Sequence, residues 1–382
     1  MKKHSPRRPL LAGTALLVCA TVLTACGGDD EPAVEASGEG ALADVCPANV
    51  VIQADWEPEA EHGGIYELVG DDYVIDTDAK KVTGNLVSGG EDTGVSVEIR
   101  IGGSTVGYQS AQSLLYQDSD ILLGYGRVGD QLVAQADTPV TAVLSTMDKS
   151  PYAIYWDPET FPDVETMADL QDVDTTIYVG SLPETWIDYL IGEGVLDESQ
   201  IDRSDAAKPA TFVSGGGEYA EVGFITAEPF MYEFEIPEWG KPVRGDLVAD
   251  NGYEEYFQAL SVRSDDVEGQ ADCLSALVPV MQQAQVDYAE DPSETNELIV
   301  ELVEEYDTGW VYTAEAAEYA HDQGLEIGIV ADGSDGVMGS FDEARVQGLM
   351  DIVGEYAGVD TAAFTPEEMA TNQFLDDSIS LG

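Results

Sequence analysis

The sequence predicts an α/β protein in which parallel-type sheets are flanked by helices and the C-terminal part is helical. Two observations predict this fold class. Short apolar runs bounded by turn residues alternate with stretches of helical periodicity up to about residue 265, and only helical stretches follow. The length of 382 residues also fits two domains or one large two-lobed unit.

The expected elements follow from these patterns in order along the chain. Short apolar runs predict strands at residues 50–54, 95–101, 121–123, 140–144, 153–156, 176–179, 221–225 and 259–262. Helical spacing predicts helices at residues 62–69, 108–116, 183–191, 267–289, 293–306, 314–325 and 341–356. A hairpin-like insert at residues 71–94 interrupts the first strand–helix unit.

The charge composition excludes one class of partner. Fifteen Lys and Arg oppose 75 Asp and Glu, giving a formal net charge of −60, whereas nucleic-acid binding depends on clustered bases. Because 44% of the residues are hydrophobic, the chain can still bury a core. Three His and four Cys leave little room for a zinc site, so we expect no metal and no nucleic acid.

The N-terminus is typical of an exported lipoprotein. Four bases lie within the first eight residues, an apolar stretch covers residues 9–25, and Leu-Thr-Ala-Cys ends at Cys26. We interpret residues 1–25 as a signal peptide, Cys26 as the lipidated residue, and 26–46 as a flexible linker. A membrane anchor is the alternative, but an apolar stretch of about 17 residues is short for one. The protein would then be lipid-anchored on the extracytoplasmic face of the cell membrane.

Export also suggests how the cysteines are used. Cys19 would leave with the signal peptide and Cys26 would carry lipid, so Cys46 and Cys273 remain in an oxidising compartment. We predict a disulfide between them, with two buried free thiols as the alternative.

The segment at residues 55–66, DWEPEAEHGGIY, is the first with functional content. It follows the first strand, and ligands of open α/β sheets collect at the carboxyl ends of strands. Trp56, held by the nearby Pro58, could offer a flat face to a ring. The alternative is that Trp56 is an ordinary aromatic residue at the edge of the core.

This segment resembles the D-W-x-P and H-x-G-x-Y motif of solute-binding proteins that serve ABC importers of thiamine-pyrimidine precursors. Their wider family includes nitrate, sulfonate and taurine binders. Further similar pieces, in order, are VEIR with GGS at residues 97–104, the strand and Gly-rich turn at 121–126, AEPFMY at 227–232 and TNQFL at 371–375. The insert at 71–94 and the acids at 57, 59 and 61 depart from the family pattern.

The resemblance implies a two-lobed, type II periplasmic-binding-protein-like fold with the ligand in an interlobe cleft. Turn-rich segments at residues 145–151 and 239–256 are plausible crossovers. Lobe one would comprise residues 47–146 and 256–382, and lobe two residues 147–255.

A competing motif is GYGRVG at residues 124–129, which matches the dinucleotide fingerprint G-x-G-x-x-G, with Asp148 about 20 residues further on. The helical stretch after it is short, and an exported protein has little access to NAD. We therefore interpret it as a permissive loop in which Tyr125 can cover a ligand. Residues 332–336 are similar to a calcium loop, but Val337 stands where that loop needs Gly.

The candidate ligand-binding residues come from these motifs, with structural alternatives left open. His62 could read a ligand ring or cap its helix, and Trp186 could stack on a ligand or pack in the core. Glu228 could accept from an amino group or hold the hinge. The full set is Asp55, Trp56, Glu57, His62, Tyr66, Ser104, Tyr125, Glu184, Trp186 and Glu228.

These observations predict a monomeric, non-enzymatic solute-binding lipoprotein that presents a small molecule to an ABC permease, without a cofactor. Acids outnumber the single base Arg127 in the motifs assigned to the cleft, which favours a nitrogen heterocycle of the aminopyrimidine, thiamine-precursor kind. One alternative is a sulfonate, nitrate or taurine binder. Another is an exported enzyme related to pyrimidine synthases, which would need reactive His and Cys residues.

Overall fold

The computed structural model describes residues 34, 36–181, 184–204 and 207–382. The expected signal peptide and Cys26 lie outside the described residues, so both stay predictions. Within the described ranges, the helices are too short or too polar to cross a bilayer.

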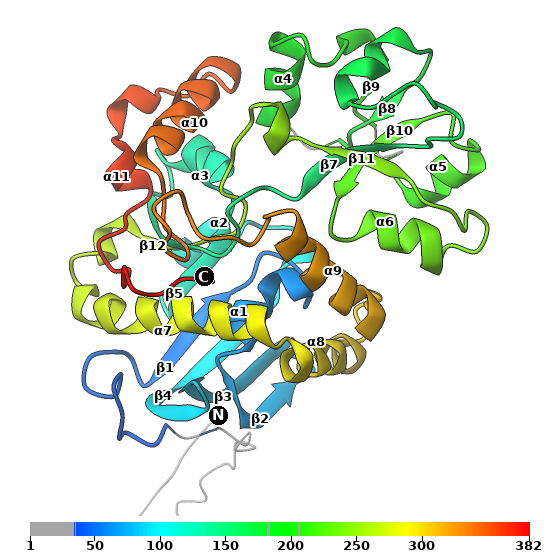
Figure 1. Cartoon of the computed structure of the whole chain (residues 1–382). Coiled ribbons are helices and arrows are strands. Elements are labelled where there is room, and N and C mark those ends of the chain that lie inside the picture. The colour runs from blue at the N-terminus through cyan, green and yellow to red at the C-terminus, as the bar shows by residue number, and fades with distance from the viewer. Residues whose placement is uncertain (1–33, 35, 182–183, 205–206) are drawn as a thin grey trace, which may run out of the picture. The chain divides into compact units, whose positions relative to one another are not determined.

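The first of two sheets has seven strands in the order β2-β3-β4-β1-β5-β12-β6 (Figure 1). The central strand β1 pairs in parallel with β4 and β5, whereas β12 is antiparallel to both β5 and β6. The side chains on both faces of β1 are buried, which fits the apolar centre of this strand. The strands are β1 Asn49–Gln53, β2 Val69–Asp76, β3 Lys81–Ser88, β4 Glu91–Arg100, β5 Ile121–Gly126, β6 Val140–Ser145 and β12 Ala259–Arg263.

The second sheet has five strands in the order β11-β7-β10-β8-β9. They are β7 Tyr152–Trp156, β8 Ile177–Tyr178, β9 Ile201–Asp202, β10 Ala220–Phe224 and β11 Arg244–Leu247. All five fall between residues 147 and 255, the range predicted for lobe two, although the division into lobes itself stays a prediction. Both sheets are mixed, because β7 and β12 each run antiparallel to their neighbours.

The seven expected helices occur in order among the described residues, and four further short helices were not predicted. Four of the helices begin at capping side chains, because Ser110, Thr313, Asp342 and Thr365 each accept a hydrogen bond from a backbone N–H of the first turn. The helices are α1 Gly63–Tyr66, α2 Ala111–Gln117, α3 Val128–Ala134, α4 Thr185–Gly192, α5 Pro209–Ser214, α6 Glu228–Phe230, α7 Ala271–Glu290, α8 Ser293–Tyr306, α9 Ala314–Glu326, α10 Glu343–Tyr356 and α11 Pro366–Met369.

The expected helix at residues 62–69 is the main error. It consists of a 3-10 turn, Ala60–His62, and the single turn α1, because strand β2 already begins at Val69. The insert forms β2 and β3, which pair antiparallel with each other and extend the sheet from β4. The hairpin expected there is thus confirmed. The strands β9 and β11 were missed because they are short and polar.

Two hydrophobic clusters stabilise the sheets. The larger one joins the first sheet to α7 and α8, and includes Ile52, Leu277 and Leu302. The second joins Trp156 of β7 to Leu349 of α10. Helix α10 contacts both α3 and α4, so the C-terminal part of the chain packs on elements from both predicted lobes.

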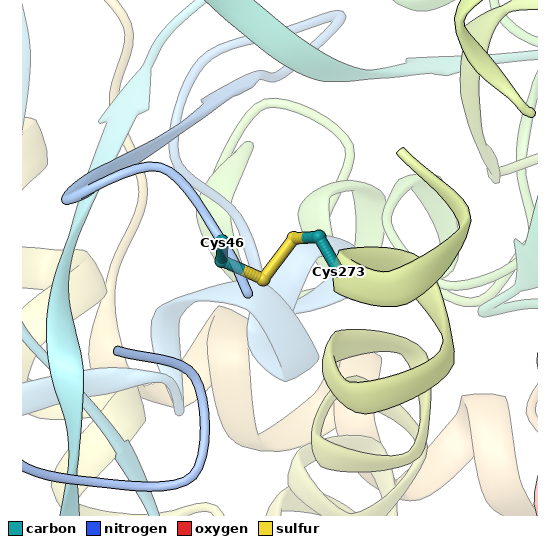
Figure 2. Close-up of a disulfide and its surroundings, with 2 residues drawn as sticks. All are labelled: Cys46 and Cys273. Carbon is teal, nitrogen blue, oxygen red and sulfur yellow. A yellow bond between two sulfur atoms is a disulfide. The ribbon is translucent and has the colours of Figure 1, made fainter. Parts of the chain in front are cut away.

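A disulfide closes the chain between its first and last thirds (Figure 2). Cys46, just before β1, bonds to Cys273 in the first turn of α7, with 4.6 Å between the Cα atoms and a sequence separation of 227. The predicted pairing is confirmed, and the bond ties α7 to the start of the first sheet.

Candidate functional site

The candidate site lies where the carboxyl ends of two strands from different sheets meet. Strand β1 leads into residues 54–62, which we call the β1 loop, and β10 leads into Thr226 and α6. The Thr226 hydroxyl donates a 2.6 Å hydrogen bond to Oε1 of Glu61 in the β1 loop. Ligands of open α/β sheets bind at the carboxyl ends of strands, so this junction is the candidate ligand site.

Asp55 and His62 form the first pair of the β1 loop. Nε2 of the fully buried His62 lies 2.8 Å from Oδ1 of Asp55. The imidazole stacks on the ring of Tyr125 at the end of β5, with 5.3 Å between centroids. Tyr125 is 1% exposed, so its ring is covered by protein, with His62 on one face. These contacts fix the histidine against the sheet.

Glu57 is held by two hydroxyl groups. The Ser104 hydroxyl lies 3.3 Å from Oε1 and the Thr308 hydroxyl 3.1 Å from Oε2, and both donate. Burial raises the pKa of Glu57, and the two hydroxyls and the charge of Lys80 oppose that rise. Ser104 therefore acts as a support for Glu57, and Thr308 is a partner that the sequence analysis did not identify.

Glu59 lies at the centre of the acidic group. Its side chain is nearly inaccessible to solvent, at 6% exposed. Burial raises the pKa of Glu59 well above its usual range, and the charges of Glu61, Asp55, Glu228 and Glu57 raise it further. Because Glu228 follows β10 while the others follow β1, acids from both strand ends act on this one carboxyl.

Glu228 combines a structural contact with a place in this group. Its Oε2 accepts a 2.5 Å hydrogen bond from the backbone N–H of Phe224, which holds the turn after β10. Burial raises the pKa of Glu228 to about 7. Glu228 thus holds the local backbone, as the structural alternative predicted, and its carboxyl group also interacts with acids of the β1 loop.

Aromatic rings border the same loop. The Trp56 ring lies 6.0 Å from that of Tyr108 and 6.1 Å, edge-on, from that of Trp310. Nε1 of Trp310 donates a 3.3 Å hydrogen bond to the carbonyl of Pro58, which ties the α8–α9 connection to the β1 loop. Trp310 was missed, although the aromatic pair at 310 and 312 between two polar helices was a visible signal.

Arg127, the one base expected in the cleft, is already paired. Its Nη1 donates to Oε2 of Glu184 at 2.8 Å, and its Nη2 donates to Oε1 of the same carboxylate at 3.3 Å and to Asp130. The guanidinium also lies over the rings of Tyr152 and Phe257. Glu184 therefore serves as the partner of Arg127, which has little left to offer an anion.

Two further candidates are packed inside the protein. Trp186 is 2% exposed within the second hydrophobic cluster, against the ring of Tyr152, so its burial favours core packing over stacking on a ligand. Tyr66 is 1% exposed in α1. Burial raises the pKa of Tyr66 well above its usual range, with smaller effects from Tyr306, Glu59, Tyr125 and Glu57. Its hydroxyl thus lies near the acids of the β1 loop.

The glycine-rich motif has the strand-then-helix form of a nucleotide loop but not its function. The backbone N–H of Gly129 in α3 donates a 3.0 Å hydrogen bond to Oε1 of the buried Glu255. A Cβ on Gly129 would lie 2.4 Å from that oxygen, so the glycine permits this contact. The Glu255 carboxyl group thus takes a backbone N–H of the first turn of α3. Among the described residues, no cluster of His, Cys, Asp and Glu could hold a metal.

Comparison with solved structures places the fold. The chain is similar to the periplasmic aliphatic sulphonate binding protein SsuA from Escherichia coli, with a TM-score of 0.54 and 11% identity over 88% of this chain and 94% of that one. It is also similar to the zinc-bound ligand-binding component of an ABC-type import system from Staphylococcus aureus, with a TM-score of 0.53 and 10% identity over 87% and 99% of the two chains. No protein-family model and no curated protein matches the sequence. The protein has the two-sheet α/β fold of periplasmic binding proteins.

Proposed function

We propose that this protein is the extracytoplasmic solute-binding component of an ABC importer and captures a small nitrogen-containing heterocycle. The observation that carries the proposal is the meeting of the β1 and β10 strand ends, which brings Glu59 and Glu228 together in a fold shared with such components. An aminopyrimidine of the thiamine-precursor kind fits because its ring can contact Trp56 and its N–H groups can donate to carboxylates.

The charges around the site argue against an anionic ligand. An anion binder needs a free Arg, Lys or convergent N–H groups. Here Arg127 is bound to Glu184, and Lys80, the base nearest Glu57, donates to the backbone carbonyl of Tyr306. Each ionised acid of the β1 loop would repel a sulfonate or nitrate by about 4 kcal/mol per like-charge contact at 4 Å and an effective dielectric of 20.

The chemistry available also argues against an enzyme of the pyrimidine-synthase kind. Such a reaction needs a reactive thiol and a free histidine. Cys46 and Cys273 form the disulfide, His62 is held by Asp55, and His321 lies beside Asp322 on α9. We therefore propose a monomeric carrier, tethered through Cys26, that delivers its ligand to a membrane permease.

A binding screen tests this function. Thermal-shift measurements with aminopyrimidines, taurine, alkanesulfonates and nitrate should show stabilisation by the first group only, since a ligand bound to the native state raises stability by mass action. Calorimetry on the best aminopyrimidine should show binding at least roughly tenfold weaker for Trp56→Ala. The control is Tyr116→Ala, which removes a 41%-exposed ring on α2, outside the site. Binding of sulfonate or nitrate without aminopyrimidine binding would contradict the proposed ligand.

A further inference from the structure

Two buried side chains, one in the β1 loop and one in α1, each carry a polar atom without a hydrogen-bond partner among the described residues. Nδ1 of His62 and the hydroxyl of Tyr66 have no hydrogen-bond partner among the described residues, although the two side chains are 0% and 1% exposed. Leaving such an atom without a partner costs about 1–3 kcal/mol, so native proteins normally supply water or a ligand. These atoms point to a bound polar molecule at the loop.

The groups acting on Glu59 define the charge that this molecule should carry. Asp55, Glu57 and Glu61 of its own loop and Glu228 of α6 act on it, and Asp55 is itself paired with His62. The phenols Tyr66 of α1 and Tyr312 of the α8–α9 connection complete its surroundings. Lys80 acts on Glu57 but is not among the main groups acting on Glu59. The surroundings of Glu59 are therefore acidic or neutral.

Glu59 itself lacks the donors that normally hold a buried carboxylate. Within the described ranges, no side chain or backbone N–H donates a hydrogen bond to its carboxyl group, whereas Glu57 receives two hydroxyls and Glu228 a backbone N–H. A buried carboxylate without donors is unfavourable, so the acid stays protonated unless a cation arrives. A protonated nitrogen would supply both the charge and the N–H donors.

We propose that Glu59 is the specificity-determining residue of the site, that it accepts a hydrogen bond from a protonated nitrogen of the ligand, and that it releases its proton to solvent when that cation binds. The inference rests on the proposed function and narrows its ligand to organic cations such as amidinium and ammonium compounds. No covalent bond forms. The O–H bond of the Glu59 carboxyl group breaks, and the cation replaces the proton.

Three probes with one ring and different charges test this selectivity. Benzamidine is cationic, benzamide neutral and benzenesulfonate anionic, so calorimetry on the mature disulfide-bonded protein isolates the effect of charge. We expect benzamidine to bind at least roughly tenfold more tightly than benzamide, and benzenesulfonate not to bind. Titration in phosphate and in Tris, whose ionisation enthalpies differ, should reveal net proton release with benzamidine alone.

Substitution then assigns the effect to one residue. Glu59→Gln should lower benzamidine affinity by roughly tenfold or more and abolish the buffer dependence, while its affinity for benzamide stays unchanged. Glu59→Asp, a second variant that keeps the charge, should retain proton release. Glu67→Gln is the matched control, because Glu67 is also partly buried, accepts from Thr295, and lies outside the β1 loop. It should change neither quantity.

The outcomes separate this inference from the proposed function. Absence of benzamidine binding, benzamide or benzenesulfonate binding as tightly as benzamidine, or a Glu59→Gln protein that behaves as wild type would each overturn the inference. If one of those other probes or an aminopyrimidine still binds, the carrier function stands. If no compound of either screen binds the wild-type protein, the proposed function fails as well.

Discussion

The guanidinium of Arg127 donates to both carboxylate oxygens of Glu184, and this pair joins the end of β5 in the first sheet to the start of α4. Arg127 follows β5, and Glu184 precedes α4. Burial raises the pKa of Glu184, and the charge and hydrogen bond of Arg127 oppose that rise. The pair thus occupies the one arginine that the sequence assigned to the cleft.

Removing that arginine should destabilise the protein. Arg127→Met would leave Glu184 unpaired in a site where the two side chains are 16% and 11% exposed, and breaking such a buried pair costs about 3 kcal/mol. Chemical denaturation at pH 7 measures the loss. The control is Arg203→Met, since Arg203 and Asp188 form an exposed pair worth about 0–1 kcal/mol. Equal losses in the two variants would contradict a buried role for Arg127.

Loss of the disulfide should destabilise the protein more than loss of the Arg127 pair does. The bond spans 227 residues, and the chain-entropy model gives about 4–5 kcal/mol for such a loop, although engineered bonds often yield less. Urea unfolding of the wild type should therefore be compared with that of the double variant Cys46→Ser/Cys273→Ser. Mass spectrometry that finds both thiols free in the exported protein would show that the bridge is absent.

The pH dependence of stability should have an unusual sign around Glu221. Burial raises the pKa of this carboxyl group from 4.5 to about 7. The Tyr232 hydroxyl donates a hydrogen bond to the carboxyl group and partly offsets the effect of burial. Since the folded state holds the proton more strongly, Glu221 makes stability fall as pH rises from about 4.5 to about 7, with no further loss above that.

Glu221→Gln should remove this dependence and, at pH 8, stabilise the protein by about 3 kcal/mol. The variant Glu218→Gln, at an exposed position nearby, should change stability by less than about 0.5 kcal/mol. Denaturation at pH 5 and pH 8 gives both values. A wild-type protein whose stability rises between those two values, in parallel with that of Glu221→Gln, would refute the assignment.

Salt should stabilise the whole protein. Seventy-five acids against 15 bases repel one another in dilute buffer, and salt shortens that repulsion to about 10 Å at 0.1 M. We expect the melting temperature to rise between low and molar NaCl, in keeping with adaptation to a saline or cation-rich exterior. An unchanged melting temperature would show that the acids are spaced too widely to matter.

Local patterns were sufficient for the order of most of the strands and helices. The buried strand β1 is apolar at its centre, from Val50 to Ile52, and is followed by a polar, Trp-containing segment, so both the strand and the segment that follows it are visible in the sequence. The pairing of Cys46 with Cys273 followed from elimination, because the expected signal peptide and lipidation would leave no other cysteines. The length of the first helix could not be predicted in this way, because β2 begins at Val69, where it pairs with Leu86 of β3.

The sequence by itself thus determined the fold class, the disulfide and the acidic character of the loop after β1. Tertiary structure alone decided which acids act together: Glu59 becomes the central group because Glu228 comes to it from the other sheet. It also decided that Glu184 binds Arg127, that Trp186 is buried, and that Trp310 from the α8–α9 connection supports the β1 loop. The physical reason is that burial and charge depend on neighbours brought together by packing, which local periodicity does not encode.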